Sequence, residues 1–332
     1  MIVVTGGAGF IGSALVWRLN QMGATDIFIV DHLAESEKWK NLVPLRFTDY
    51  LDRLEFIERL EHGDFGESIS AIFHLGACSS TTEKNADYLL ENNYRYTVRI
   101  AQWREQHPKC RFIYASSAAT YGDGRNGYTD NEETLTMLRP LNLYGYSKHL
   151  FDCRAKQQGW HKSIVGLKYF NVFGPNEYHK GDMRSVINKA YPEVRDRGVM
   201  RLFKSYLPDY ADGEQKRDFI YIKDALEMTL FFLERPDING IFNIGTGKAR
   251  SWNDIARALF AAADQPLNIE YIPMPETIRE KYQYFTCADL AKLRKAGCTH
   301  ACRGLEEAVA DYVRNYLVHG CVLDGPAAGQ EQ

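Results

Sequence analysis

The 332-residue sequence predicts an α/β fold, in which a doubly wound parallel sheet carries helices on both faces. Short runs of β-branched and aromatic residues alternate with longer segments of helical spacing as far as residue 169. The first run leads at once into a glycine-rich turn, and two later runs end in small polar residues. Beyond residue 175, loops with glycine and proline interrupt the pattern. We therefore expect a smaller C-terminal α/β lobe built from separate segments.

The N-terminus has the order and spacing of a dinucleotide-binding βαβ unit. This unit consists of a strand at 2–4, a glycine-rich turn at 5–12, a helix that ends near Gly23, and a strand at 26–30 that ends on Asp31. Gly6 allows a tight turn, Gly9 lets the backbone approach a pyrophosphate, and Gly12 lets the helix pack closely on the sheet. The phosphates would lie at the helix N-terminus, where free N–H groups favour negative charge. The sequence thus predicts a Rossmann-type dinucleotide site.

The remaining elements follow from hydrophobic spacing. Further strands are expected within 42–49 and at 70–75, 111–115, 163–169, 217–222 and 240–245. Helices are expected at 51–60, 85–106, 143–156, 183–194, 225–233, 252–263 and 304–316. We assign 1–171 and 216–248 to the dinucleotide-binding Rossmann domain, 172–215 and 249–319 to a substrate-binding lobe, and 320–332 to a disordered tail.

Composition narrows the class of protein. Forty Lys and Arg against 43 Asp and Glu, with no basic stripe, exclude a nucleic-acid partner. No stretch reaches the ~18 apolar residues that span a bilayer, and the chain begins in a core strand, which leaves no room for a signal peptide. The seven scattered cysteines fit reduced thiols in the cytoplasm. Cys298, His300 and Cys302, with Cys287 before them, match no common zinc spacing, so we expect no metal site.

A second pattern predicts redox chemistry on an alcohol. Tyr144 and Lys148 are four residues apart in an expected helix and share one face. An ammonium beside a phenol favours the phenolate and lowers its pKa from ~10, so that Tyr144 can act as a general base. Lys148 can also hold the nicotinamide ribose. Ser117, at a strand end, can donate a hydrogen bond to a developing oxyanion.

The glycine turn, Asp31, Ser117, Tyr144 and Lys148 resemble the extended short-chain dehydrogenase/reductase family, of the NAD-dependent epimerase/dehydratase type. The resemblance covers nearly all of residues 1–319. Several stretches are most similar to the branch of this family that epimerises ADP-heptoses at C6: 76–83, 92–94, 115–122, 169–175, 179–181 and 282–286. The resemblance implies an isomerase that interconverts ADP-D-glycero-β-D-manno-heptose and ADP-L-glycero-β-D-manno-heptose for lipopolysaccharide core synthesis. It also implies a homo-oligomer, of the homopentameric kind.

The same resemblance implies two acid/base residues. Oxidation at C6 leaves a flat ketone, and rotation about one exocyclic bond lets the hydride return to the other face. Tyr144 would then serve one epimer and Lys180, in an expected loop, would serve the other.

Ligand-binding residues are implied residue by residue. The cofactor would contact Gly6, Gly9, Phe10, Ile11, Gly12, Asp31, His32, Lys38, Arg53, Leu75, Gly76, Ala77, Cys78, Ser79, Asn92, Lys148, Val172 and Lys180. The sugar nucleotide would contact Ser117, Asn171, Asp182, Lys189, Phe203, Lys204, Ser205, Tyr206, Arg217 and Tyr282. The planar fork of Arg217 suits a diphosphate, although a salt bridge between the lobes is an alternative role.

The choice of cofactor depends on the end of the second strand. Asp31 is typical of a residue that hydrogen-bonds the 2′-hydroxyl of NAD, whereas Lys38, Lys40 and Arg53 can neutralise the 2′-phosphate of NADP. We expect NADP, with NAD as the alternative.

Two other functions stay open. One is a different sugar-nucleotide epimerase or reductase of the same family. The other is a regulatory protein that senses NADP without turnover; the presence of both Tyr144 and Lys148 favours an enzyme.

Overall fold

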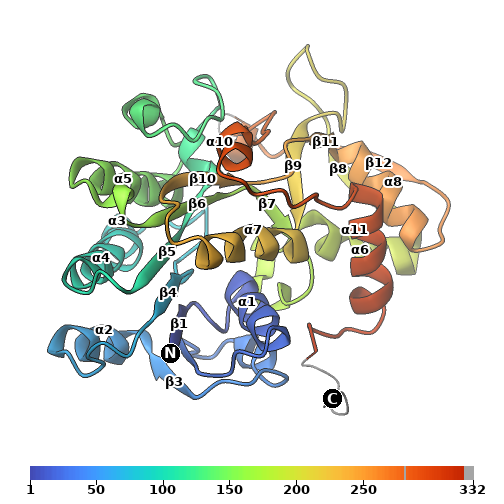
Figure 1. The fold of residues 1–332 in the computed structure, drawn as a ribbon. Helices are drawn as coiled ribbons and strands as arrows, with labels where there is room; N and C mark the ends of the chain where they lie inside the picture. The colour runs from blue at the N-terminus through green and yellow to red at the C-terminus, as the bar shows by residue number, and fades with distance from the viewer. Residues whose placement is uncertain (280–281, 325–332) are drawn as a thin grey trace.

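The computed structural model describes residues 1–279 and 282–324 (Figure 1). Its centre is a seven-stranded sheet in the order β10-β6-β5-β4-β1-β2-β3. These strands are β1 (Ile2–Thr5), β2 (Ile27–Asp31), β3 (Asp49–Asp52), β4 (Ala71–His74), β5 (Arg111–Ser117), β6 (Val165–Tyr169) and β10 (Gly240–Ile244). Every neighbouring pair is parallel. The predicted parallel sheet is confirmed.

Helices cover both faces of this sheet (Figure 1). The helices of the whole fold are α1 (Phe10–Gln21), α2 (Arg53–His62), α3 (Ala86–Leu89), α4 (Tyr96–Gln106), α5 (Leu143–Gln157), α6 (Val186–Arg197), α7 (Ile222–Glu234), α8 (Trp252–Ala262), α9 (Glu276–Arg279), α10 (Ala291–Lys295) and α11 (Leu305–Tyr312), of which α6, α8 and α11 pack beside the smaller sheets. Successive strand residues point to opposite faces, so Val4 packs in a core with α1 and α7, and Val3 in a core with α2, α4 and α5. The doubly wound architecture is therefore as predicted.

Two small sheets lie beyond the large one. The first joins β7 (Asn171–Phe173), β9 (Lys216–Tyr221) and β11 (Ala249–Ser251), and the second pairs β8 (Met200–Phe203) with β12 (Ile269–Ile272). Strand β9 pairs with β7 and β11, and within 216–248 the strand that joins the large sheet is β10. One hydrophobic core runs from Val4 through α7 to Leu259 and Val309, so both parts pack on each other.

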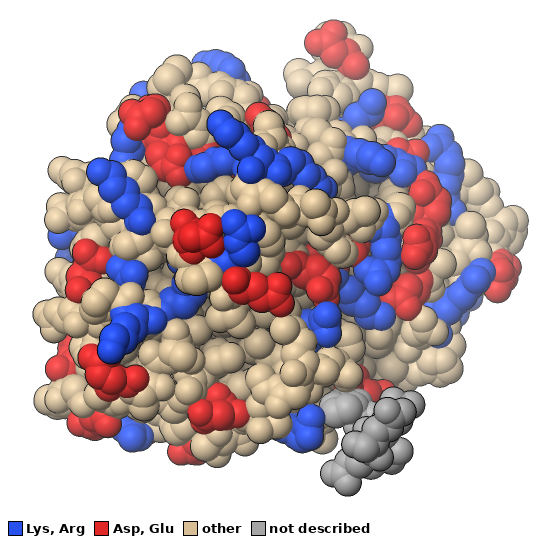
Figure 2. Space-filling model, viewed as in Figure 1, with Lys and Arg blue, Asp and Glu red and all other residues tan. Residues whose placement is uncertain are grey.

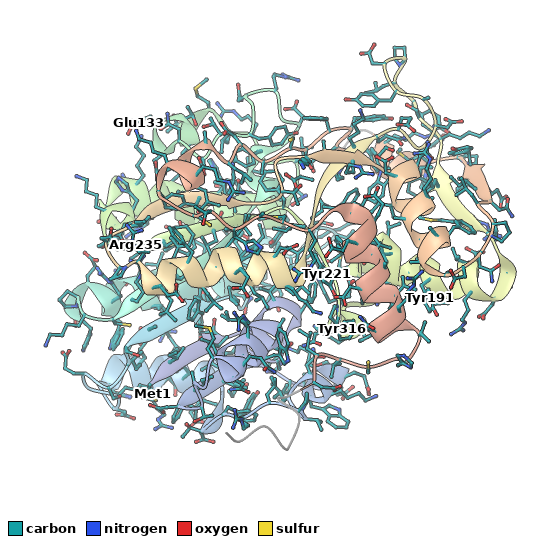
Figure 3. The ribbon with its side chains drawn as sticks, turned by 45° about the vertical axis from the view of Figure 1, so that its right-hand side comes forward. Met1, Glu133, Tyr191, Tyr221, Arg235 and Tyr316 are labelled. Atoms are coloured by element: carbon teal, nitrogen blue, oxygen red, sulfur yellow. The ribbon has the colours of Figure 1, made fainter. Side chains whose placement is uncertain are left out.

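The C-terminal helix is fixed to the end of β9. Figure 3 labels Tyr221 at this point, beside α11. Its hydroxyl donates to Asp311 at 2.6 Å, and Lys223 donates to the same carboxylate at 2.8 Å. These bonds join the last helix to the strand that links the two parts of the fold.

Three local expectations need correction. The third strand runs from Asp49 to Asp52 and shares only Asp49 with the expected segment 42–49, because Pro44 lacks an N–H for a strand ladder and the chain up to Thr48 is a loop. The expected helix 85–106 contains a π turn at Leu90–Arg95. Residues 320–324 are not a disordered tail: Leu323 is 1% exposed and its N–H donates to Asn176 Oδ1 at 2.8 Å. The rest of the expected tail, 325–332, lies outside the described residues.

The surface carries mixed charge. Lys and Arg side chains are interspersed with Asp and Glu on the face drawn in Figure 2. Among residues 1–279 and 282–324, no helix is both long enough and apolar enough to cross a membrane.

A buried polar cluster fixes α5 against the large sheet. Lys168 on β6 and Asp152 on α5 are both fully buried, and their charged groups are 2.7 Å apart. Asp152 also accepts hydrogen bonds from Tyr114 at 2.9 Å and from Ser116 at 2.7 Å. Lys168 donates to Thr120 at 2.6 Å. Because each charge is paired and hydrogen-bonded, the cluster is tolerated in the core and orients α5.

Breaking this pair should be costly. Lys168→Met leaves the Asp152 carboxylate buried without its counter-ion, so we expect urea denaturation to show a loss of about 3–5 kcal/mol of unfolding free energy. Glu133→Gln, which removes the exposed partner of Lys156, is the matched control and should cost at most about 1 kcal/mol. Equal losses in the two variants would contradict this role for the cluster.

Candidate active site

A cavity of about 1580 Å³ opens at the carboxyl edge of the large sheet. The turns after β1, β4 and β5, the start of α5 and residues 183–187 line it. The strand order reverses between β1 and β4, the place where α/β sheets bind their ligands. The volume exceeds the ~300–1,000 Å³ typical of one small ligand, so the cavity has room for two.

Three glycines build the floor of this cavity. A Cβ on Gly12 would lie 2.1 Å from the carbonyl oxygen of Gly6, and one on Gly6 (φ +67°) would lie 2.6 Å from the Gly76 nitrogen. The turn after β1 therefore packs backbone to backbone against α1 and against the turn after β4. Gly9 begins α1 without a capping side chain, which leaves free N–H groups facing the cavity. This cradle fits a dinucleotide pyrophosphate.

Asp31 ends β2 at the same edge and is 8% exposed. Its carboxylate accepts the Ala8 N–H at 2.9 Å, the His32 N–H at 2.7 Å and the Lys38 ammonium at 2.6 Å. Asp31 and Lys38 both line the cavity. Asp31, expected to bind the ribose hydroxyl, and Lys38, expected to bind a 2′-phosphate, thus lie side by side.

Three other residues expected to contact the cofactor, His32, Arg53 and Asn92, do not line the cavity. His32 is within 3.2 Å of Asp52, and Arg53 donates to the amide oxygen of Asn92. The pairing of β2 with β3 places Asp31 opposite Asp52, so these side chains lie at the strand end next to the cavity.

Tyr144, Lys148 and Ser117 all line the cavity. Asn142 caps α5 by accepting the Gly145 N–H at 2.8 Å, which starts the helix just before Tyr144. Removal from water raises the pKa of Tyr144, and a hydrogen bond with Ser117 opposes that rise. The expected lowering of this pKa by Lys148 is therefore wrong for the protein without ligands, because desolvation dominates.

Lys148 itself is only 4% exposed. Burial lowers its pKa to about 8, and Asp152, one turn further along α5, partly opposes that shift. A lysine of this kind exchanges its proton near neutral pH.

The π turn after α3 contributes a residue that the sequence did not reveal. Asn93 is fully buried and bonds both the N–H and the carbonyl of Cys78 at 2.9 Å. It also donates to Ser147 at 3.0 Å, and Ser147 donates to the Tyr144 carbonyl at 2.7 Å. Asn93 thus joins the turn after β4 to the helix that carries Tyr144. The signal in the sequence was the stretch 92–94, which resembles the ADP-heptose branch but gave only Asn92 as an expected site residue.

Lys180 reaches the cavity from a different element, the 3₁₀ helix Tyr178–Met183. Its ammonium is 5.3 Å from the centre of the Phe10 ring, which is part of the glycine turn. Desolvation lowers the pKa of Lys180, and Glu177 opposes that shift. Tyr144 and Lys180, the two residues expected to transfer protons, therefore line one cavity from separate elements.

Arg217 lies at the other end of the lining and is 6% exposed. Its guanidinium lies 5.2 Å from the Tyr282 ring centre and 5.9 Å from that of Trp252. Trp252, which the sequence did not reveal, donates to the Tyr282 hydroxyl at 2.8 Å. Within the described parts of the chain no carboxylate is within ion-pairing distance of Arg217, so the salt-bridge alternative has no support there. A buried cation of this kind suits a diphosphate.

The remaining residues expected around the sugar nucleotide divide into two groups. Asn171 and Tyr282 line the cavity. The others lie outside its lining: Asp182, Lys189, Phe203, Lys204, Ser205 and Tyr206. Lys189 turns back to the Asp182 carbonyl at 3.0 Å, and the Tyr206 N–H donates to Tyr284 at 3.1 Å.

The cofactor residues expected after β4 and β7 do line the cavity: Leu75, Gly76, Ala77, Cys78, Ser79 and Val172. Among the lining residues that were not predicted as site residues are His179, which precedes Lys180, Arg184 on the same loop, and Tyr146 on α5, which is 44% exposed.

One cluster in the described residues has the atoms of a metal site. Asp224, His300 and Cys302 place one ligand atom each within 4.8 Å of the others. The Asp224 carboxylate already accepts from His300 at 3.0 Å and from the Arg303 side chain at 2.5 Å. The Asp224 carboxylate is thus already paired with the Arg303 cation.

The family to which the chain belongs follows from sequence comparison. The sequence model described as NAD dependent epimerase/dehydratase family matches residues 2–245. The chain belongs to this family. The nicotinamide class of the cofactor agrees with that description, and the glycine cradle and Asp31 fit it.

Individual relatives agree with this placement. A protein of Nitratidesulfovibrio vulgaris named ADP-L-glycero-D-manno-heptose-6-epimerase is 56% identical over 317 residues, which is 96% of this chain and 98% of the relative. One of the same name from Fusobacterium nucleatum is 47% identical, with 96% and 98% covered. The crystal structure of the Helicobacter pylori protein of that name has a TM-score of 0.79 at 25% identity and covers 96% of both chains. The predicted resemblance and the enzyme class, an epimerase, are confirmed.

The glycine cradle gives a direct prediction. Gly12→Ala forces a Cβ against the Gly6 carbonyl, so we expect calorimetry to show binding of nicotinamide dinucleotides weakened at least about tenfold. Gly304→Ala, whose Cβ would meet nothing closer than 3.9 Å, is the control and should bind normally. Unchanged affinity in Gly12→Ala would show that the cradle does not hold the dinucleotide.

Proposed function

We propose that this epimerase interconverts ADP-D-glycero-β-D-manno-heptose and ADP-L-glycero-β-D-manno-heptose through transient oxidation at C6, with bound NADP. One observation carries the proposal: Tyr144 and Lys180 reach one cavity from separate elements, beside a dinucleotide cradle. Inversion of a carbon by oxidation and reduction needs a proton acceptor for each epimer. The names of the relatives supply the sugar.

The residues divide the chemistry between them. A bound nicotinamide supplies the acceptor and donor for the hydride at C6. Tyr144 takes the C6 hydroxyl proton of one epimer, while Ser117 donates a hydrogen bond to that oxygen. Lys180 takes the corresponding proton of the other epimer. Lys148 holds the ribose next to the nicotinamide.

Separate parts of the chain hold the two ligands. We assign the cofactor to the domain of the large sheet, through the glycine turn, Asp31 and Lys38. The sugar nucleotide is bound by the smaller lobe, where Arg217 binds its diphosphate between Tyr282 and Trp252.

The cellular role follows from the substrate. Supply of L-glycero-heptose for the lipopolysaccharide core, in the cytoplasm, is the proposed role. A homo-oligomer, of the homopentameric kind, is the proposed assembly; the resemblance to the ADP-heptose branch supports both.

The proposal is tested with the substrate. The wild-type protein, incubated with ADP-D-glycero-β-D-manno-heptose, should give the L-glycero epimer, followed at C6 by proton NMR. Tyr144→Phe and Lys180→Ala each remove one acid/base group and should each slow epimerisation by about 10²–10⁴-fold. Full activity in Lys180→Ala would contradict the two-residue scheme, and conversion of UDP-hexoses but not of ADP-heptose would favour another epimerase of this family.

The cofactor choice has its own test. Lys38→Ala removes the cation beside Asp31, so calorimetry should show affinity for NADP reduced about tenfold and affinity for NAD changed less than about twofold. Lys40→Ala, on the same 3₁₀ helix but 58% exposed, is the control and should change neither affinity. Equal losses for both dinucleotides in Lys38→Ala would contradict recognition of a 2′-phosphate.

A further inference from the structure

One buried carboxylate closes the loop that carries Lys180. Glu177 is 1% exposed. Its Oε1 accepts the Gly174 N–H at 3.3 Å and the Ser185 hydroxyl at 2.7 Å, and its Oε2 accepts the Ser185 N–H at 2.5 Å. Gly174 and Ser185 are the two ends of the loop, so Glu177 holds both ends together and leaves Lys180 at the turn between them.

The same carboxylate joins the loop to two helices. Tyr312 on α11 is fully buried and donates its hydroxyl to Glu177 Oε1 at 3.1 Å. Asn188 on α6 donates to the Tyr312 hydroxyl at 2.7 Å. Glu177 therefore receives its hydrogen bonds from neutral donors alone, as the described residues show. Burial raises the pKa of Glu177, whereas the hydrogen bonds from Ser185 and Gly174 and the charge of Lys180 oppose that rise and favour the carboxylate.

The base of the loop is joined to the cofactor side of the cavity. Asn176 is fully buried with φ +77°, a conformation that asparagine tolerates better than most residues. Its side chain donates to Ser13 on α1 at 2.9 Å. The amide of Asn41 donates to both the Ala8 carbonyl, at 3.0 Å, and the Asn176 carbonyl, at 3.1 Å. The glycine turn and the loop are thus held at a fixed separation.

We propose that Glu177 is a positioning residue for Lys180: it closes the 174–185 loop so that the ammonium faces the glycine turn, and its charge favours the protonated state. The inference rests on the proposed function, in which Lys180 is one of the two acid/base groups. A residue that transfers a proton needs both a fixed place and a pKa suited to the working pH.

The groups around Lys180 are few. Glu177 precedes it on the loop, the neutral ring of Phe10 faces it from α1, and His179 lies next to it. Burial and the nearby cations Lys180 and Lys38 lower the pKa of His179 to about 4, so that it is neutral near pH 7. The carboxylate of Asp31 is paired with Lys38. Glu177 is thus the negative charge left to act on Lys180.

The direction of the effect follows from this arrangement. Desolvation favours the neutral amine and lowers the pKa of Lys180, and Glu177 partly restores it. Glu177→Gln removes that opposition, so the pKa of Lys180 should fall further. The neutral amine would then predominate at lower pH.

Labelling of the full-length protein without substrate tests the charge. The acetic anhydride reactivity of Lys180, read by mass spectrometry across pH, follows the neutral fraction of its amine. We expect the midpoint of labelling to move about one pH unit lower in Glu177→Gln. Asp311→Asn is the matched control. It also removes a carboxylate on α11, next to Tyr312, but that carboxylate pairs with Lys223 and not with Lys180. The labelling midpoint of Lys180 should therefore stay unchanged in this variant.

A second variant separates geometry from charge. Glu177→Asp keeps the charge on a shorter side chain, so Lys180 should keep its labelling midpoint while kcat for epimerisation falls about 100-fold with KM little changed. An unshifted midpoint in folded Glu177→Gln, or wild-type kcat in Glu177→Asp, would overturn the proposal. If Glu177→Gln does not fold, Glu177→Asp alone decides. A shifted midpoint in a protein that never converts ADP-heptose would refute the proposed function and leave the control of Lys180 by Glu177 in place.

Discussion

The parallel order of the large sheet is the constraint on which the site depends. Because every strand points the same way, the turns after β1, β2, β4 and β5 all emerge at one edge. Residues far apart in the sequence, such as Gly12, Asp31 and Ser117, therefore meet around one cavity. The reversal of strand order between β1 and β4 opens the space that a dinucleotide needs.

The second proposed acid/base residue comes from outside that edge. Lys180 lies on a loop after β7, a strand of the three-stranded sheet, and buried polar bonds help to fix its place. Glu177 closes the loop, and Asn41 joins it to the glycine turn. Tyr144, in contrast, is fixed by α5 and by the buried pair of Asp152 with Lys168 below it. The proposed mechanism needs both groups held in place, since each would have to reach one face of the same carbon.

The sequence predicted those parts of the fold in which local pattern and tertiary structure agree. The βαβ unit, the helix with Tyr144 and Lys148, and the alternation of strands and helices depend on hydrophobic spacing and glycine positions, which a single chain displays. Residues that act through long-range contacts gave no such signal. Asn93 is placed by a π turn. The strand at 216–221 belongs to the three-stranded sheet and not to the large one because it pairs with β7 and β11, which lie elsewhere in the sequence. The burial of Leu323 depends on Asn176, nearly 150 positions earlier.

The central claim is that the hydrogen on C6 leaves and returns within one closed site. Its most direct test uses ADP-heptose that carries deuterium at C6, epimerised by the wild-type protein in ordinary water. We expect the product to keep its deuterium at C6, as measured by mass spectrometry and by the missing C6 signal in proton NMR. Replacement of that deuterium by hydrogen from the solvent would show that the carbon is inverted by proton removal, and would contradict the mechanism.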